Sequence, residues 1–132
     1  MSPIAVVFDD TTCTALHDPT DPAHEAVAAF YVQASGGLGT LYAPVLAVAA
    51  ADVARPGVLP YLTGLRFLTL ESFDTDDATT ASELVRAGRS WACAHAVHAA
   101  RPSAHFPTGR YLLTTDPGRY DGTGVQAVHP DQ

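Results

Sequence analysis

The stretch IAVVFDDTTCTAL, residues 4–16, constrains the fold of this chain more than any other. It opens with a short apolar run over 4–8 that does not alternate with polar residues, which is typical of a parallel strand buried on both faces. Two adjacent carboxylates, Asp9 and Asp10, follow this run. Open sheets of parallel strands bind ligands at the carboxyl ends of their strands, so the stretch predicts a polar site there. The alternative is that the carboxylates only cap the next helix.

The rest of the chain alternates between strand-like and helical segments. This alternation predicts an α/β fold, a three-layer α/β/α sandwich with a mostly parallel central sheet. Further strands are expected over 41–43, 66–70, 110–116 and 125–130, and helical segments over 11–17, 22–34 (with Asp21 as its cap), 44–54, 58–65, 75–87 (capped by Asp74 or Thr75) and 90–101.

The length and composition bound the organisation of the chain. With 132 residues and 47% hydrophobic content, we expect a single domain over 1–132. We find no apolar stretch of membrane-spanning length and no signal-peptide pattern, so we expect no membrane partner and a cytoplasmic location. Cys13 and Cys93 form no metal or redox pair and are expected to be small buried residues.

The charge pattern excludes several classes of protein. All seven basic residues are arginine, and the formal net charge is −7. Without lysine the chain cannot be a P-loop NTPase or form a Schiff base. A phosphoacceptor receiver domain also needs a lysine, and a haloacid-dehalogenase-like phosphatase needs a second Asp where Thr11 stands. The acidic excess also disfavours non-specific binding to nucleic acid.

A third carboxylate is expected to lie at the same edge of the sheet. Asp116 ends the predicted strand over 110–116. Right-handed crossovers place the carboxyl ends of parallel strands on one side, so Asp9, Asp10 and Asp116 should be neighbours in space.

Four blocks of the sequence together resemble the PIN domain family of metal-dependent nucleases. VVFDDTTCTAL is similar to the family's first motif, in which Asp9 matches the Asp and Thr11 the Ser or Thr. YAPVLAVAAADVAR is similar to the second block and WACAHAVHAA to the third. YLLTTDPGRY is similar to the fourth, where Asp116 matches the last Asp and Thr114 and Thr115 the hydroxyl residues.

The resemblance implies an Mg²⁺- or Mn²⁺-dependent endoribonuclease, a hydrolase of RNA. In that hypothesis Asp9 and Asp116 are the principal metal ligands, and Thr11 and Thr115 orient them through hydrogen bonds. Small proteins of the family are often the toxins of toxin–antitoxin pairs, so the resemblance also implies an antitoxin-like or other protein partner.

The expected acidic set is incomplete in this sequence. The second block has Ala49, Ala50 and Ala51 where an acidic residue is expected, with Asp52 just after them, and the third has Ala94 with His95 beside it. Asp10, Asp52 and His95 are therefore weaker candidates for the missing ligands, the histidine with Mn²⁺, which tolerates imidazole.

Other interpretations stay open beside the ribonuclease. The incomplete site favours a catalytically inactive PIN-like domain, a pseudoenzyme that binds protein or RNA. The apolar segment over 45–54 also allows a homodimer interface. His95 and His98 share one helix face, which is more typical of a helix surface than of a metal pair. Trp91 is expected to anchor its helix in the core, Tyr120 to anchor a loop, and Arg119 to be a solvated partner of the acidic surface or a phosphate contact.

Overall fold

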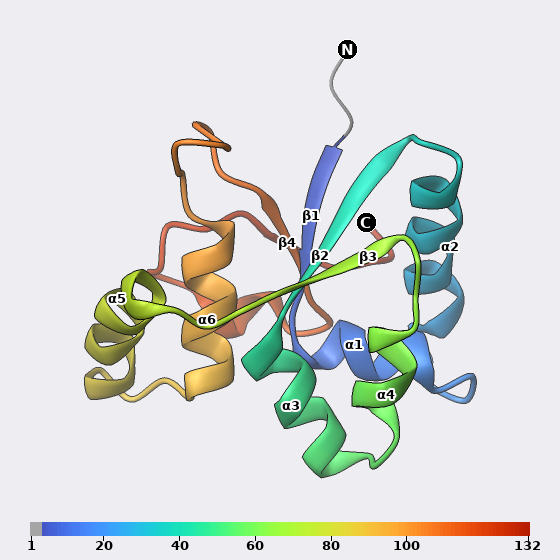
Figure 1. Cartoon of the computed structure of the whole chain (residues 1–132), viewed down its shortest axis with the longest axis horizontal. Coiled ribbons are helices and arrows are strands. Elements are labelled where there is room, and N and C mark those ends of the chain that lie inside the picture. Colours follow the sequence, from blue (N-terminus) through green and yellow to red (C-terminus); the bar gives the residue numbers. More distant parts are fainter. Residues whose placement is uncertain (1–3) are drawn as a thin grey trace.

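A computed structural model describes residues 4–132. Its centre is a five-stranded, all-parallel sheet in the order β3-β2-β1-β4-β5. The strands are β1 (Ile4–Phe8), β2 (Gly39–Pro44), β3 (Leu68–Glu71), β4 (Tyr111–Leu113) and β5 (Ala127–Val128). The α/β class and the parallel sheet predicted from the sequence are confirmed, and the apolar β1 lies in the middle of the sheet (Figure 1).

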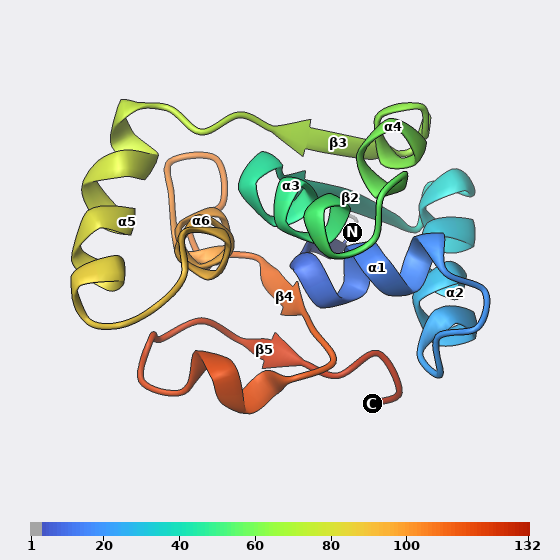
Figure 2. The same cartoon turned by 90° about the horizontal axis from the view of Figure 1, so that it is seen from below.

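The helices lie on both faces of the sheet (Figure 2). They are α1 (Asp10–His17), α2 (His24–Ser35), α3 (Val45–Ala54), α4 (Val58–Thr63), α5 (Thr75–Arg86) and α6 (Trp91–Ala100), with a short 3₁₀ helix, η1 (Pro117–Tyr120). Within the described part of the chain, no helix is long and apolar enough to span a membrane.

Alternate residues of β1 face two separate cores, which explains its unbroken apolar sequence. Val6 and Phe8 pack among residues of α1, α2, α3 and α4. Val7 points to the other face and packs with α6 and Tyr120. The fully buried Val7 and Phe8 thus hold β1 between two helical layers, and the position of residue 9 at the end of the strand is fixed by both cores.

Capping residues decide where several helices begin. Asp74 caps α5 through a capping box with Asp77, and Ser90 accepts a hydrogen bond from the backbone N–H of Cys93 at the start of α6. Helix α2, in contrast, begins at His24 and not at Pro22. The predicted cap is wrong because the Asp21 carboxylate instead accepts the N–H of Ala23 in the turn before the helix.

The burial expected for the two cysteines is confirmed, but the burial expected for Trp91 is wrong. Cys13 and Cys93 are buried, as expected, and burial raises the pKa of both thiols. Trp91 is instead half exposed. As the first residue of α6 it packs edge-on against Phe73 at the helix end, while smaller side chains such as Ala94 and Val97 bury the helix face.

Candidate acidic site at the carboxyl edge of the sheet

Asp9 connects the end of β1 to the start of α1 and is completely buried. Its Oδ1 accepts hydrogen bonds from the backbone N–H of Thr11 at 2.9 Å and of Thr12 at 3.2 Å, and from the Thr11 hydroxyl at 2.6 Å. It is therefore the N-cap of α1, and the partial positive charge of the helix N-terminus stabilises its carboxylate.

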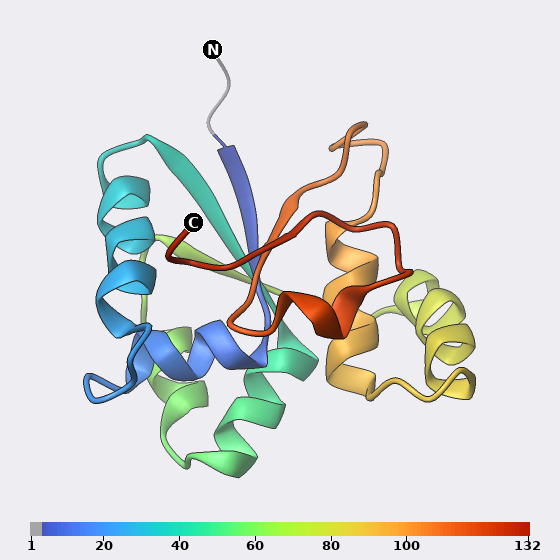
Figure 3. The same ribbon diagram turned by 180° about the vertical axis from the view of Figure 1, so that it is seen from behind.

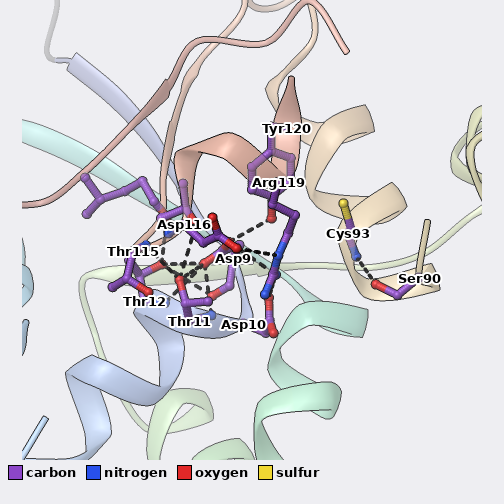
Figure 4. A network of polar contacts seen from close by, with 12 residues as sticks. Asp9, Asp10, Thr11, Thr12, Ser90, Cys93, Thr115, Asp116, Arg119 and Tyr120 are labelled. Carbon is purple, nitrogen blue, oxygen red and sulfur yellow. Dashed lines mark hydrogen bonds and ion pairs between the residues drawn. The ribbon is translucent and has the colours of Figure 1, made fainter. Parts of the chain in front are cut away.

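The second oxygen of Asp9 also has a protein donor. The Tyr120 hydroxyl donates to Asp9 Oδ2 at 2.7 Å, and the phenol is buried. Burial, together with the nearby Asp9 charge, raises the pKa of Tyr120, so the phenol stays neutral and remains a donor. Both carboxylate oxygens of Asp9 are thus bound by the protein itself (Figure 4).

A threonine network joins the ends of β1 and β4. Thr11 Oγ1 accepts the backbone N–H of Thr115 at 3.0 Å and lies 3.3 Å from the hydroxyl oxygen of Thr114. Thr114 in turn accepts the N–H of Asp116 at 3.1 Å. Thr115 therefore takes part through its backbone, and the side-chain links come from Thr11 and Thr114.

Arg119 brings the three carboxylates of this edge together. Its Nη1 lies 2.6 Å from Asp10 Oδ1 and 3.7 Å from Asp9 Oδ2, and its Nε lies 4.0 Å from Asp116 Oδ2. We call Asp9, Asp10, Asp116 and Arg119 the guanidinium cluster. The neighbouring Asp10 carboxylate raises the pKa of Arg119 against the effect of burial, so the guanidinium is permanently charged.

The η1 segment carries both Arg119 and Tyr120 to the site. It crosses below β4 beside α6 (Figure 3). The guanidinium of Arg89 donates to the backbone carbonyl of Arg119, and at 2.9 Å to that of Asp121. The contacts of Arg119 and Tyr120 with Asp9 were not predicted from the sequence. The available signal was the DPGRY stretch, in which an Arg and a Tyr follow three and four residues after Asp116.

The remaining candidate ligands lie elsewhere in the fold. Asp52 Oδ1 accepts the backbone N–H groups of Gly57 and Leu59, both at 3.0 Å, and so organises the start of α4. His95 is buried in α6, where its Nδ1 accepts the N–H of Leu46. Its expected position on a helix surface is wrong, because both sides of this alanine-rich helix are covered.

His95 belongs to a second polar cluster, between α5 and α6. The Asp77 carboxylate Oδ1 lies 3.1 Å from His98 Nε2 and 3.8 Å from His95 Nε2. We call Asp77, His95 and His98 the imidazole cluster. It lines an open cavity of about 510 Å³. Burial raises the pKa of Asp77 and lowers that of His95.

The residues of the acidic edge do not fit a divalent metal ion. Both oxygens of Asp9 accept hydrogen bonds from the protein, and the guanidinium of Arg119 is the cation that its carboxylates contact. Over residues 4–132, no group of three or more histidine, cysteine, aspartate or glutamate side chains is arranged to hold a metal. The arrangement is suited to joining β1, α1, β4 and η1.

Known proteins match this chain in structure and not in sequence. No protein-family model and no curated protein sequence matches it. A chain of FitAB bound to an IR36 DNA fragment is similar with a TM-score of 0.59 and 15% identity, covering 96% of each chain. VapC20 of Mycobacterium tuberculosis, a toxin that cleaves the sarcin-ricin loop, is similar with a TM-score of 0.53 and 16% identity, covering 68% of this chain and 76% of that chain.

At such low identity, the likeness concerns the fold alone. The fold is PIN-like, so the family resemblance predicted from the four sequence blocks is confirmed at the level of architecture.

Proposed function

We propose that this chain is a catalytically inactive PIN-like domain that acts by binding a protein partner. The observation that carries the proposal is the position of Arg119, whose Nη1 lies 2.6 Å from Asp10 and 3.7 Å from Asp9. If the chain were a metal-dependent ribonuclease, as the resemblance to PIN domains implies, its carboxylates would have to be free to bind metal ions. Here donors of the protein itself bind both oxygens of Asp9, and Arg119 pairs with Asp10.

The net charge supports a protein partner over an RNA. With a formal net charge of −7 and no lysine, the chain offers little positive charge to compensate phosphates. A basic surface on a partner protein is complementary to it, and such complementarity speeds association. An antitoxin-like partner belongs to this class. A cytoplasmic location and a homodimer remain predictions; the elution volume in size-exclusion chromatography tests the latter.

A metal-dependent ribonuclease is the second candidate, and one observation favours it. The threonine network brings Asp116 to the edge where Asp9 and Asp10 emerge, which is the placement expected for Asp9 and Asp116 as Mg²⁺ or Mn²⁺ ligands. In that hypothesis Thr11 and Thr115 orient the ligands, and the Asp10 and Asp116 side chains are the accessible ones.

Cleavage of RNA decides between the two candidates. We expect the purified chain to leave a fluorescent structured RNA intact with Mg²⁺ or Mn²⁺, at the same background rate as Asp116→Asn. Asp116 is the suitable control because its side chain is largely exposed and lies 4.0 Å from Arg119, so we expect Asp116→Asn to fold like the wild type. Metal-dependent cleavage that disappears in Asp116→Asn would establish the ribonuclease and overturn the proposal.

A further inference from the structure

Asp77 and Asp9 are the two buried carboxylates in the described part of the chain, and their charges are compensated differently. Asp9 lies close to the permanently charged Arg119. Asp77 is 8% exposed, and over residues 4–132 its ion-pair partners are the imidazoles of His98 at 3.1 Å and His95 at 3.8 Å. A neutral imidazole can donate a hydrogen bond but brings no positive charge. Whenever both rings are neutral, the buried charge of Asp77 therefore lacks a cation.

The groups that surround Asp77 do not supply that cation. Its Oδ2 accepts the backbone N–H of Asp74 at 2.8 Å, and the N-terminus of α5 contributes only a partial positive charge. The guanidinium of Arg110 is already bound to Glu71 at 2.8 and 3.2 Å and to the carbonyl of Ala99. Because buried charges in proteins are normally paired, Asp77 Oδ1 is an acceptor available to a cation from outside the chain.

The cavity beside Asp77 has the size and the charge to admit such a cation. Its volume is about 510 Å³ and it is open to solvent. The carboxylates of Glu71, Asp74 and Asp77 line it against the single arginine Arg110, which leaves a net charge of −2 when the histidines are neutral. Within the described chain, none of the four residues of the guanidinium cluster lines this cavity. It is therefore a separate acidic cavity, formed by β3, α5, α6 and the loop after α6.

We propose that this cavity is the docking site for an arginine side chain of the protein partner, with its guanidinium paired to Asp77. A guanidinium is always charged, is more weakly hydrated than an ammonium and carries five N–H donors. These donors suit a wall of carboxylate and hydroxyl oxygens, as the pairing of Arg110 with Glu71 in the same cavity illustrates. The inference deepens the proposed function and rests on it for the nature of the partner, a protein with a basic surface.

Protonation of the histidines should compete with the guanidinium. His95 and His98 face Asp77 from α6, and His105 lies in the cavity wall beside the carboxylates and Arg110. Histidine takes up a proton as the pH falls below neutral, and the chain then supplies its own cation to Asp77. The raised pKa of Asp77 acts in the same direction. A guanidinium should therefore bind more tightly at pH 8 than at pH 5.5.

The experiment uses the full chain and N-acetyl-arginine amide as the probe. N-acetyl-citrulline amide is the matched control ligand, because it has nearly the same shape with a neutral urea in place of the guanidinium. Each ligand is titrated at constant ionic strength while NMR follows the imidazole C–H signals of His98, which His98→Gln identifies. This readout reports on the cavity and not on the rest of the acidic surface.

We expect the capped arginine to shift the His98 signals saturably at pH 8, in the millimolar range typical of one side chain, and the capped citrulline to cause no saturable shift. The affinity should be about tenfold lower at pH 5.5. Asp77→Asn keeps an oxygen for the Asp74 N–H and should weaken binding by at least about tenfold. Asp76→Asn, at an exposed residue of α5 outside the cavity, should change it by less than about twofold.

Four results would overturn the inference. They are the absence of a saturable His98 shift at pH 8, equal binding of the capped citrulline, binding that does not weaken at pH 5.5, and equal weakening in Asp76→Asn and Asp77→Asn. Putrescine binding more than about ten times more tightly than the capped arginine would assign the cavity to a free amine and would also overturn it.

The test stays decisive if Asp77→Asn does not fold, because the citrulline and pH comparisons use the wild type alone. None of these measurements involves RNA. Cleavage of RNA by the wild type therefore remains the separate result that overturns the proposed function.

Discussion

In the guanidinium cluster the carboxylates face a permanently charged arginine, whereas in the imidazole cluster the carboxylate faces histidines whose charge depends on pH. Asp9, the buried carboxylate of the first, is satisfied by a helix N-terminus, a phenol and an arginine that stays charged at all physiological pH. Asp77, the carboxylate of the second, faces two histidines, one of them buried. Histidine changes its charge near neutral pH. The first cluster is therefore a fixed structural element, whereas the second responds to pH.

The largest effect should come from Asp9→Ala. It removes the N-cap of α1 and leaves the buried Tyr120 hydroxyl without its acceptor, so the free energy of unfolding should fall by about 3 kcal/mol. Chemical denaturation measures it. Asp116→Ala, which removes an exposed carboxylate 4.0 Å from Arg119, should cost less than about 0.5 kcal/mol. Equal losses in the two variants would contradict the central role of Asp9.

Tyr120→Phe should have the next largest effect. It removes only the hydroxyl that donates to Asp9 Oδ2 at 2.7 Å and keeps the ring packed in its core. Because the hydrogen bond is to a charged acceptor, the loss should be about 1.5 kcal/mol. Tyr111→Phe, at a partly exposed tyrosine of β4, is the control and should be close to neutral. A neutral Tyr120→Phe would mean that the phenol is not needed to satisfy Asp9.

The carboxylates of the site could be predicted from the sequence, whereas the donors that contact them could not. Asp9 and Asp116 could be placed together because each follows a parallel strand, and that placement depends only on topology. Tyr120 and Arg119 lie on η1, a single 3₁₀ turn after β4, where no hydrophobic period fixes the direction of a side chain. Their contacts depend on the path of the loop, which Arg89 fixes from another part of the chain.

The fold was more predictable than the site because most elements carry their own local signals. The apolar β1 and the Asp74 cap of α5 are examples, and both are confirmed. Helix α2 shows the limit: Asp21 and Pro22 suit both a helix start and a turn, and the turn occurs. His95 shows a second limit of prediction. The alanines around it are compatible with an exposed or a buried helix face, and His95 is buried because α5 packs on α6.

The imidazole cluster should make stability depend on pH in one direction. Burial lowers the pKa of His95, so the unfolded chain takes up a proton at a higher pH than the folded chain. The stability that neutral His95 contributes is present above its unfolded pKa of about 6.5 and is lost as the pH falls. Between pH 7 and 5 the loss should be on the order of 1 kcal/mol.

His95→Gln should flatten this pH dependence while keeping an acceptor for the Leu46 N–H. His105→Gln, at an exposed histidine, should leave the slope unchanged, and urea unfolding at several pH values compares the two.

The other groups around His95 are Asp77, His98 and Glu71. The raised pKa of Asp77 acts in the opposite direction, favouring the folded state as the pH falls toward 4. An unchanged or steeper slope in His95→Gln would contradict the role of His95 in this pH dependence.

Asp10→Asn should have a smaller effect than Asp9→Ala, Tyr120→Phe and the pH change, and its salt dependence completes the comparison. Asp10 and Arg119 are both about 30% exposed, at 28% and 31%, so their ion pair is partly screened and should contribute about 0.5 kcal/mol at low ionic strength. The difference from the wild type should largely disappear in about 1 M NaCl, where the Debye length is near 3 Å. The loss caused by Asp9→Ala should persist there, because it arises from buried hydrogen bonds. If salt reduced both losses equally, Asp9 would be acting through its charge and not as the buried acceptor that joins β1 to η1.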